Sequence, residues 1–278
     1  GYVRPSYITL ERGGINDHSS LPRSASFYLG GQVRDVASPR PVGTVFWHAA
    51  LWAILYYIAS SLLRPVFRHY EHHRRLAIRE AFPWVWGLWR KYYYHWKERK
   101  IRSALVSELR GNFFLLPLQV HYDSQIRIHS DYDEVETFIE YVVVDFAKNA
   151  PADTCLVLKH HPMDRAYRDF TKLCMRLMSE HNLGGRLWYV HDVHLPTIFR
   201  HTRGIVVVNS TVGLSGVLDG VPVKVCGRAL YDMDGLTFQG PLSDFWSLAP
   251  NVKPSKDLVS KFYAYLIEQT QINGSVYK

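Results

Sequence analysis

GIVVVN, residues 204–209, is a short apolar run that leads directly into Ser210, Thr211 and a predicted helix. A run of this length, rich in β-branched residues and followed by polar ones, is typical of a strand buried on both faces. Four other runs share the pattern: FFLLPLQV at 113–120, CLVLK at 155–159, LWYV at 187–190 and PVKVC at 222–226. Helix candidates lie between and after them, near residues 133–149, 165–181, 195–201, 211–219 and 256–269. This alternation predicts an α/β fold in which helices cover both faces of a parallel sheet.

The composition limits the class of protein. Of the 278 residues, 47% are hydrophobic and 21% are charged, which suffices for a sizeable core and excludes global disorder. The three cysteines, Cys155, Cys174 and Cys226, form no CxxC pair. This favours reduced thiols in a cytoplasmic compartment over a disulfide scaffold or a zinc ribbon. The chain has no signal-peptide pattern and opens in a structured-looking segment, so we expect a piece of a longer protein.

Polar residues follow the carboxyl ends of four predicted strands, at the edge where open parallel sheets bind ligands. We expect all four clusters to face one crevice, which favours a binding site. Each cluster alone has a structural explanation, because Asp123 could close a turn, His161 could be a core histidine, and Ser210 or Thr211 could cap a helix. The clusters are Gln119 and Asp123; Lys159, His160, His161 and Pro162; His191, Asp192 and His194; and Asn209, Ser210 and Thr211.

The side chains of this predicted crevice suit a phosphate. A helix N-terminus with two hydroxyls binds phosphate without a metal, and Lys159 and the histidine pair add cationic or hydrogen-bonding donors. The sequence has no GxxxxGK[ST], GxGxxG, Asp-x-Asp or HExxH pattern, so we expect no cofactor and no metal. The best fit is a nucleoside-monophosphate leaving group, with Asp123 placed to attack or stabilise a cationic sugar centre.

The positive charge is confined to one segment. The net charge is +8, and residues 64–102 hold eleven Lys/Arg against three Asp/Glu, so the rest of the chain is neutral. Six of the eight tryptophans lie in or near this segment, which follows the uncharged run VFWHAALWAILYYIASSLL at residues 45–63. The pattern suits an anionic membrane surface, nucleic acid or a solvated helical face. We favour the membrane and not nucleic acid, because the remainder of the chain is neutral. Whether residues 45–63 span the membrane or lie on it stays open. The residues expected to face lipid are Arg74, Arg75, Arg79, Arg90 and Lys91.

An ordered series of motifs resembles a known family. The motifs are GYVRPSYITLERGGIN, LPLQVHYDSQI, LVLKHHPMDR and NSTVGLSGVLDGVPVKVCGRALYD, followed by GLT. The series covers nearly the whole chain and resembles the Kps/Lip-type capsule polysaccharide biosynthesis proteins of Gram-negative bacteria, in their single-module form. The resemblance implies a GT-B glycosyltransferase that transfers β-Kdo with retention from CMP-Kdo to a lysophosphatidylglycerol or a growing Kdo linker. It also implies a cytoplasmic enzyme, peripheral on the inner membrane, with other capsule assembly proteins as further partners.

The same family resembles bacterial sialyltransferases, which pair an HP motif with a Ser/Thr motif around CMP. His161-Pro162 and Ser210-Thr211 occupy those places in this chain. The QVxxD aspartate, the candidate nucleophile of the family, falls on Asp123. The resemblance therefore implies that Asp123 and His161 are catalytic. The residues expected to hold CMP-Kdo are Gln119, Lys159, His160, Pro162, Asn209, Ser210 and Thr211.

The resemblance implies the C-terminal Rossmann-like half of a GT-B enzyme with a helical insertion. Residues 1–44 are then an arm or remnant of the N-terminal Rossmann-like domain, 45–110 a helical lipid-facing segment, and 111–278 the CMP-sugar-binding domain. An acid/base residue of the N-terminal domain would lie outside this chain. A second hypothesis is a membrane-surface binding or assembly component of capsule export, with a degenerate sugar-nucleotide site. RNA binding through residues 64–102 is a weaker third.

Overall fold

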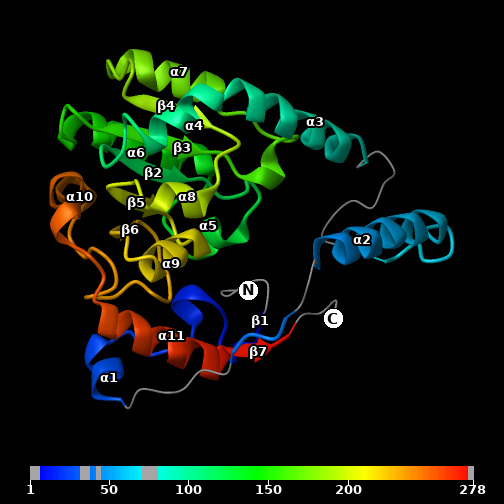
Figure 1. Ribbon diagram of the computed structural model, residues 1–278. Coiled ribbons are helices and arrows are strands. Elements are labelled where there is room, and N and C mark those ends of the chain that lie inside the picture. The colour runs from blue at the N-terminus through cyan, green and yellow to red at the C-terminus, as the bar shows by residue number, and fades with distance from the viewer. Residues whose placement is uncertain (1–6, 32–37, 42–44, 71–80, 275–278) are drawn as a thin grey trace.

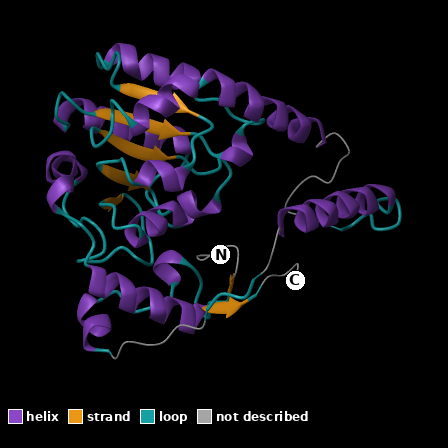
Figure 2. Ribbon diagram, viewed as in Figure 1, coloured by secondary structure: helices purple, strands orange, loops and turns teal. Residues whose placement is uncertain are grey.

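A parallel five-stranded sheet forms the centre of the molecule (Figures 1 and 2). The computed structural model describes residues 7–31, 38–41, 45–70 and 81–274. All four neighbouring pairs of strands in the sheet are parallel, which confirms the predicted α/β fold. In spatial order the strands are β4 (Leu187–Val190), β3 (Cys155–Lys159), β2 (Phe113–Pro117), β5 (Gly204–Val207) and β6 (Val223–Val225).

Helices cover both faces of the sheet because its strands carry apolar side chains on both sides. In β2, Phe113 and Leu115 pack into one core, whereas Phe114 and Leu116 pack into the other. All four side chains are fully buried, and each burial contributes about 1.5–3 kcal/mol. The first core includes residues of α8 (Leu195–Phe199), α9 (Thr211–Leu218) and α11 (Lys256–Thr270). The second includes residues of α6 (Val135–Asn149), α7 (Thr171–Glu180) and α10 (Leu242–Leu248).

The N-terminal segment packs against the C-terminal end of the chain. Strand β1 (Tyr7–Thr9) pairs antiparallel with β7 (Gln271–Asn273), and the 3-10 helix η1 (Asn16–His18) follows it. Helix α1 (Ala25–Gly30) lies beside α11 (Figure 1). The Tyr28 ring meets Phe262 and Tyr265 of α11 edge to face, with ring centroids 5.4 and 5.6 Å apart. These contacts join the N-terminal segment to the body that carries the sheet.

Residues 45–110 contain three helices, α2 (Val45–Leu62), α3 (Ala81–Lys97) and α4 (Arg99–Val106). Figure 1 shows α2 apart from the sheet, and at least half of each of the side chains of Leu51, Trp52 and Ile54 is exposed. A helix that is apolar on all sides normally lies in a protein core or in lipid. In the described ranges, no helix combines the length and the apolar character needed to cross a membrane. Three of the residues expected to face lipid lie outside the described residues: Arg74, Arg75 and Arg79.

Two predicted boundaries are wrong by three residues or more, and both lie at the carboxyl edge of the sheet. The strand expected over 113–120 ends at Pro117, and the helix expected over 165–181 begins at Thr171. Residues 118–120 and 165–170 lie in loops instead. Side chains form hydrogen bonds to the backbone of these loops, as described below. The short helices α5 (Ser124–Ile128), η3 (Pro162–Asp164), α10 and η4 (Ala249–Asn251) were not predicted, because so few residues show no helical period.

Helix α9 approaches the sheet closely at Gly213. A β-carbon at Gly213 would collide with the Tyr231 hydroxyl and would lie 2.9 Å from Val207 Cγ2. The Tyr231 side chain cannot move aside freely, because it is buried and its hydroxyl donates to the Ser210 carbonyl at 2.6 Å. Glycine at this position therefore sets the position of α9 and of the residues at its N-terminus.

Gly213→Ala should destabilise the fold by about 1–3 kcal/mol, because the added methyl overpacks the space between α9, β5 and Tyr231. Urea unfolding measures the change. Gly184→Ala is the matched control, since no atom lies within 4 Å of a β-carbon at that turn. Equal urea midpoints for Gly213→Ala and Gly184→Ala would contradict the close approach of α9 to the sheet.

Candidate functional site

The strand order reverses between β2 and β5. From β2 the chain continues to β3 and β4 on one side of the sheet, and from β5 it continues to β6 on the other. In doubly wound α/β proteins, ligands bind in the crevice at the carboxyl ends of the strands at such a point. The predicted clusters that follow β2, β3 and β5 lie at the ends of three adjacent strands.

The Gln119 side chain joins two of these strand ends. Its Nε2 donates to Asp123 Oδ2 and to Asn209 Oδ1, both at 3.1 Å. The Asn209 Nδ2 in turn donates to the carbonyls of Gln125 at 2.8 Å and His129 at 3.1 Å. Gln119 and Asn209 are both buried, so these bonds offset the cost of removing two amides from water. The Gln119 Oε1 is also buried and has no hydrogen-bond partner among the described residues, which leaves it able to accept one from a ligand.

Asp123 is half-buried at the start of α5. Its Oδ1 accepts from the Gln125 backbone N–H at 3.0 Å, which makes Asp123 the N-cap of that helix. The local geometry of Asp123 therefore matches the structural explanation, in which its side chain closes a turn. The N-cap bond and the Gln119 bond hold the carboxylate at the strand end, and a fixed position is also what a nucleophile needs.

His161 is half-buried and follows β3. Its Nδ1 accepts from the Met163 backbone N–H at 3.2 Å, and Pro162 begins η3 with an exposed side chain. Burial and the nearby Lys159 ammonium lower the pKa of His161, which favours the neutral ring. In a neutral ring whose Nδ1 accepts, Nε2 carries the proton. His161 can therefore donate one hydrogen bond to an anion without carrying a charge.

Lys159 and His160 are adjacent and both buried, but they differ in charge at neutral pH. The buried Lys159 Nζ donates to the His160 carbonyl at 3.0 Å, and burial lowers the pKa of Lys159 to about 8, so the side chain is mainly charged at neutral pH. His160 is fully buried with Nδ1 2.6 Å from the Tyr189 hydroxyl, and burial lowers its pKa to about 3. The expectation that His160 supplies a cation to a phosphate is therefore wrong, because its ring is neutral and enclosed.

Helix α9 begins at the end of β5. The Ser210 Oγ accepts from the Val212 N–H at 3.2 Å, and its backbone carbonyl accepts from Tyr231. Thr211, the first residue of the helix, is exposed. The capping explanation holds for Ser210. The same end of α9 also carries the partial positive charge of the helix dipole, which favours an anion.

A second bond network connects the loops after β2 and β3. Asp164 is fully buried and accepts from the His121 backbone N–H at 2.7 Å, and its Oδ1 lies 2.6 Å from His121 Nδ1. Sequence reasoning missed both residues, although they lie within the motifs that were singled out. A cavity of about 310 Å³ borders this loop and is lined by His121, Tyr122, Ser124, Arg127, Ile128, Glu134, Glu136 and Arg168.

The residues after β4 hold α3 and α4 on the sheet. Glu98, buried between those helices, accepts from the backbone N–H groups of His191 and Asp192, both at 2.8 Å. The His191 ring stacks on Tyr94 of α3 with centroids 3.5 Å apart. The expectation that this cluster faces the crevice is therefore wrong for His191, because its side chain is buried in this contact. No sequence signal marked Glu98, which lies within a mainly basic run.

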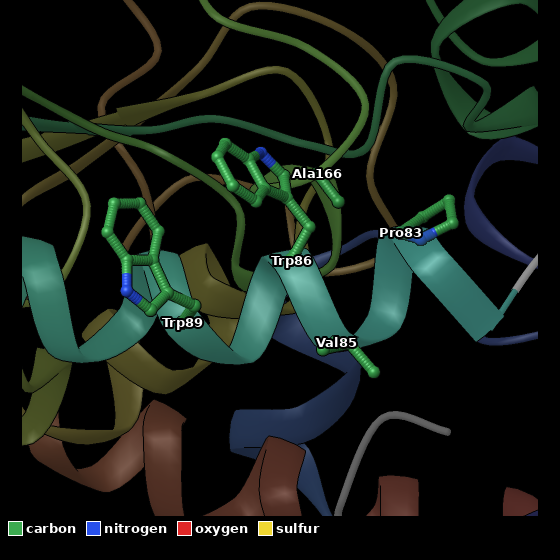
Figure 3. A pocket seen from close by; sticks show the side chains of 5 residues that line it. All are labelled: Pro83, Val85, Trp86, Trp89 and Ala166. Carbon is green, nitrogen blue, oxygen red and sulfur yellow. The ribbon is translucent and has the colours of Figure 1, made fainter.

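Helix α3 carries both a buried anchor and exposed aromatic rings. Arg90 turns inward, where it donates to Asp169 at 2.7 Å and to the Tyr94 hydroxyl at 2.7 Å. Arg90 therefore anchors the helix, which does not fit its expected role as a lipid-facing cation, whereas Lys91 is exposed. The rings of Trp86 and Trp89, each more than half exposed, stack with centroids 5.0 Å apart. A shallow apolar groove of about 620 Å³ lies beside them (Figure 3), lined by Pro83, Val85, Trp86, Trp89 and Ala166.

The fold defines an α/β protein with a doubly wound parallel sheet, in which hydrogen-bonded polar side chains lie where the strand order reverses. The chain belongs to the family described as "Capsule polysaccharide biosynthesis protein", whose sequence model matches residues 1–277. It is 41% identical over 283 residues to the Escherichia coli "Capsule polysaccharide export protein KpsS", with 100% of this chain and 71% of that protein covered. It is 42% identical over 283 residues to the Neisseria meningitidis serogroup A "Capsule polysaccharide modification protein LipB", with 100% and 67% covered.

Solved structures include a distant match. It is "Thermosulfurimonas dismutans KpsC, beta Kdo 2,7 transferase", with 20% sequence identity and a TM-score of 0.36. The match covers 65% of this chain and 57% of that one.

Lys159 should make stability depend on pH. Its pKa is about 8 in the folded state and lies near 10.5 when the chain unfolds, so the unfolded state binds more protons between these values. Stability from this group therefore rises with pH above 8. Lys159→Met should be more stable than the parent at pH 7, and this advantage should shrink by roughly 2 kcal/mol by pH 9.5. Urea unfolding at both pH values measures the stability difference between Lys159→Met and the parent. A difference that does not change with pH would contradict a buried Lys159 amine with a lowered pKa.

Proposed function

We propose that this chain is a retaining glycosyltransferase that moves β-Kdo from CMP-Kdo to a lysophosphatidylglycerol-type lipid in capsule linker synthesis. The observation that carries the proposal is the Gln119 side chain, which holds the Asp123 carboxylate and Asn209 together where the strand order reverses. Family membership and the 41–42% identical capsule proteins support a role in capsule biogenesis. The donor, the acceptor and the stereochemistry are our inference.

The CMP phosphate is placed at the N-terminus of α9. Ser210 and Thr211 begin that helix, and Asn209 precedes it. His161 donates through Nε2–H, and Lys159 supplies the positive charge. Such fixed donors stabilise the negative charge that develops on the phosphate as the leaving group departs. The unpartnered Gln119 Oε1 accepts from a donor hydroxyl or amine.

The transfer takes two displacements at one carbon. An Asp123 carboxylate oxygen bonds to the anomeric carbon of Kdo while the bond from that carbon to the phosphate oxygen breaks, and CMP leaves with the electron pair. The acceptor hydroxyl then bonds to the same carbon and releases the carboxylate, so the configuration is retained. The proposed reaction uses no cofactor and no metal.

We place the chain within a GT-B enzyme as follows. Residues 111–278 are the CMP-sugar-binding half, 1–44 an arm of the other half, and 45–110 a helical insertion. The packing of the N-terminal segment on α11 supports a structural connection between the first and last of these parts. An acid/base residue from the other half would receive the acceptor proton.

The exposed aromatic rings of α3 support a peripheral site on the cytoplasmic face of the inner membrane. Trp86 and Trp89 are each more than half exposed, and Trp89 continues the stack to Tyr93 at 5.5 Å. Aromatic rings lie at the level of lipid headgroups, and the basic residues around α3, Lys91 among them, attract anionic lipid. The groove beside the tryptophans suits an acyl chain. Other capsule assembly proteins would meet the enzyme at this surface.

Asp123→Asn should lower the rate of Kdo transfer by roughly a thousandfold or more while CMP still binds, since an amide is a poor nucleophile. Asparagine is as good an N-cap as aspartate, so α5 should keep its position. The measurements are transfer from CMP-Kdo to lysophosphatidylglycerol and titration with CMP. Asp153→Asn, in an exposed turn before β3, is the control. Near-normal turnover of Asp123→Asn would exclude Asp123 as the nucleophile.

Replacing Trp86 and Trp89 together by alanine should reduce co-sedimentation with phosphatidylglycerol liposomes, at low and high salt alike, because burial of indole rings is insensitive to screening. Trp188→Ala, which removes an exposed tryptophan on β4, is the control. CMP titration checks that the crevice is unchanged. If the double variant pellets as the parent does, α3 is not a membrane contact.

A second candidate is a membrane-surface binding or assembly component of capsule export with a degenerate sugar-nucleotide site. The observation that favours it is that both oxygens of Asp123 already accept hydrogen bonds in the protein. This reading predicts liposome and CMP binding without turnover of CMP-Kdo, in the parent and in Asp123→Asn alike.

A further inference from the structure

Three potential metal ligands meet at the C-terminal end of α5. Asp17 and His18 come from η1, and His129 directly follows α5, 112 residues from Asp17 in sequence. The His129 Nδ1 contacts the Asp17 carboxylate, and one ligating atom from each of the three residues lies within 4.8 Å of those of the other two. The cluster is separate from the crevice residues assigned to CMP-Kdo. Its long sequence separation explains why no spacing motif revealed it.

The η1 turn is held in place by its neighbours. Asn16 is buried and adopts a left-handed conformation with φ 53°, which costs free energy unless the surroundings impose it. Its Nδ2 donates to Gln125 Oε1 at 2.8 Å, and Arg23 donates to its carbonyl at 2.7 Å. These bonds fix the backbone immediately before Asp17. His129 is buried as well, so two of the three ligands are positioned before any ion arrives.

The Asp17 carboxylate is bonded on both sides. Its Oδ2 accepts from Arg228 Nε at 3.1 Å, while Oδ1 faces His129. Arg228 is also bound by Asp131 at 2.8 Å and by the carbonyls of Ile128 and Ser130. Arg228 therefore does not depend on Asp17 for its position. A second, outer bond of this kind orients a ligating carboxylate in metal sites.

We propose that Asp17, His18 and His129 bind one divalent transition-metal ion of the zinc class, which ties the N-terminal segment to α5. Two imidazoles and one carboxylate suit zinc, cobalt or nickel, whereas magnesium and calcium prefer oxygen ligands alone. Ligand atoms around a tetrahedral zinc ion lie about 3.3 Å apart, so the contacting Asp17 and His129 atoms must separate slightly while His18 approaches them. His18 is exposed and can supply it by turning its ring. A water molecule completes the fourth position.

The role of this ion is structural. His129 accepts, through its carbonyl, a hydrogen bond from the Asn209 side chain, and α5 begins at Asp123. The ion would therefore stabilise a segment that begins at Asp123 and contacts Asn209, both assigned to the crevice, without touching the donor. The inference does not rest on the proposed transfer reaction, which uses no metal.

Titration of the metal-stripped chain with Co²⁺ should give saturable one-to-one binding with visible absorption bands of a tetrahedral site, and Zn²⁺ should displace it. His18→Ala should weaken Zn²⁺ binding at least about tenfold and remove the rise in melting temperature that Zn²⁺ causes. His18 is the decisive variant because, being exposed, it can be replaced without disturbing the fold, unlike the buried His129. His69→Ala, another exposed histidine, is the matched control.

Absence of saturable Co²⁺ binding in the parent would overturn the proposal and leave a hydrogen-bonded cluster of Asp17, His129 and Arg228. Equal Zn²⁺ affinities of His18→Ala and His69→Ala would also overturn it. Zn²⁺ binding by Asp123→Asn should equal that of the parent. The metal-binding test therefore stays valid if the transferase assignment fails. The test of the transferase assignment likewise stays valid if no metal binds.

Discussion

The two hydrogen bonds donated by the Gln119 amide are the contacts on which the arrangement of the crevice depends. The bond to Asn209 joins the end of β2 to the end of β5, the two strands between which the strand order reverses, and the bond to Asp123 fixes the carboxylate beside it. Because the amide is buried, losing either partner would leave a polar group without compensation, at a cost of about 1–3 kcal/mol. The position of Asp123 relative to the N-terminus of α9 follows from these bonds.

The loop after β3 is fixed in a comparable way, through Asp164 and His121. The end of β4 has a different use, because Glu98 and Tyr94 dock the aromatic helix α3 there. The ends of three strands thus frame the proposed donor site, and the helix of the proposed lipid contact is attached at the fourth. The proposed reaction needs that proximity, since a soluble nucleotide sugar and a membrane lipid must meet at one carbon.

The sheet could be predicted because buried parallel strands leave a local pattern: the five apolar runs match five strands, and their polar ends lie where doubly wound sheets bind ligands. The roles of single residues could not be predicted, because burial and distant contacts determine them. His160 and His161 are neighbours in the sequence, yet only His160 is fully buried. Glu98 acts on a residue 93 positions away, and Asp17 contacts one 112 positions away. Arg90 lies among lipid-facing candidates but pairs with Asp169.

The most direct test of the central claim is to identify the residue that becomes bonded to the sugar. Rapid quenching of the enzyme with CMP-Kdo, followed by proteolysis and mass spectrometry, would locate the covalent intermediate. The account predicts a Kdo ester on the peptide that contains Asp123, formed before product and lost when the acceptor lipid is added. A Kdo adduct on another residue, or transfer with inversion and no adduct, would contradict it.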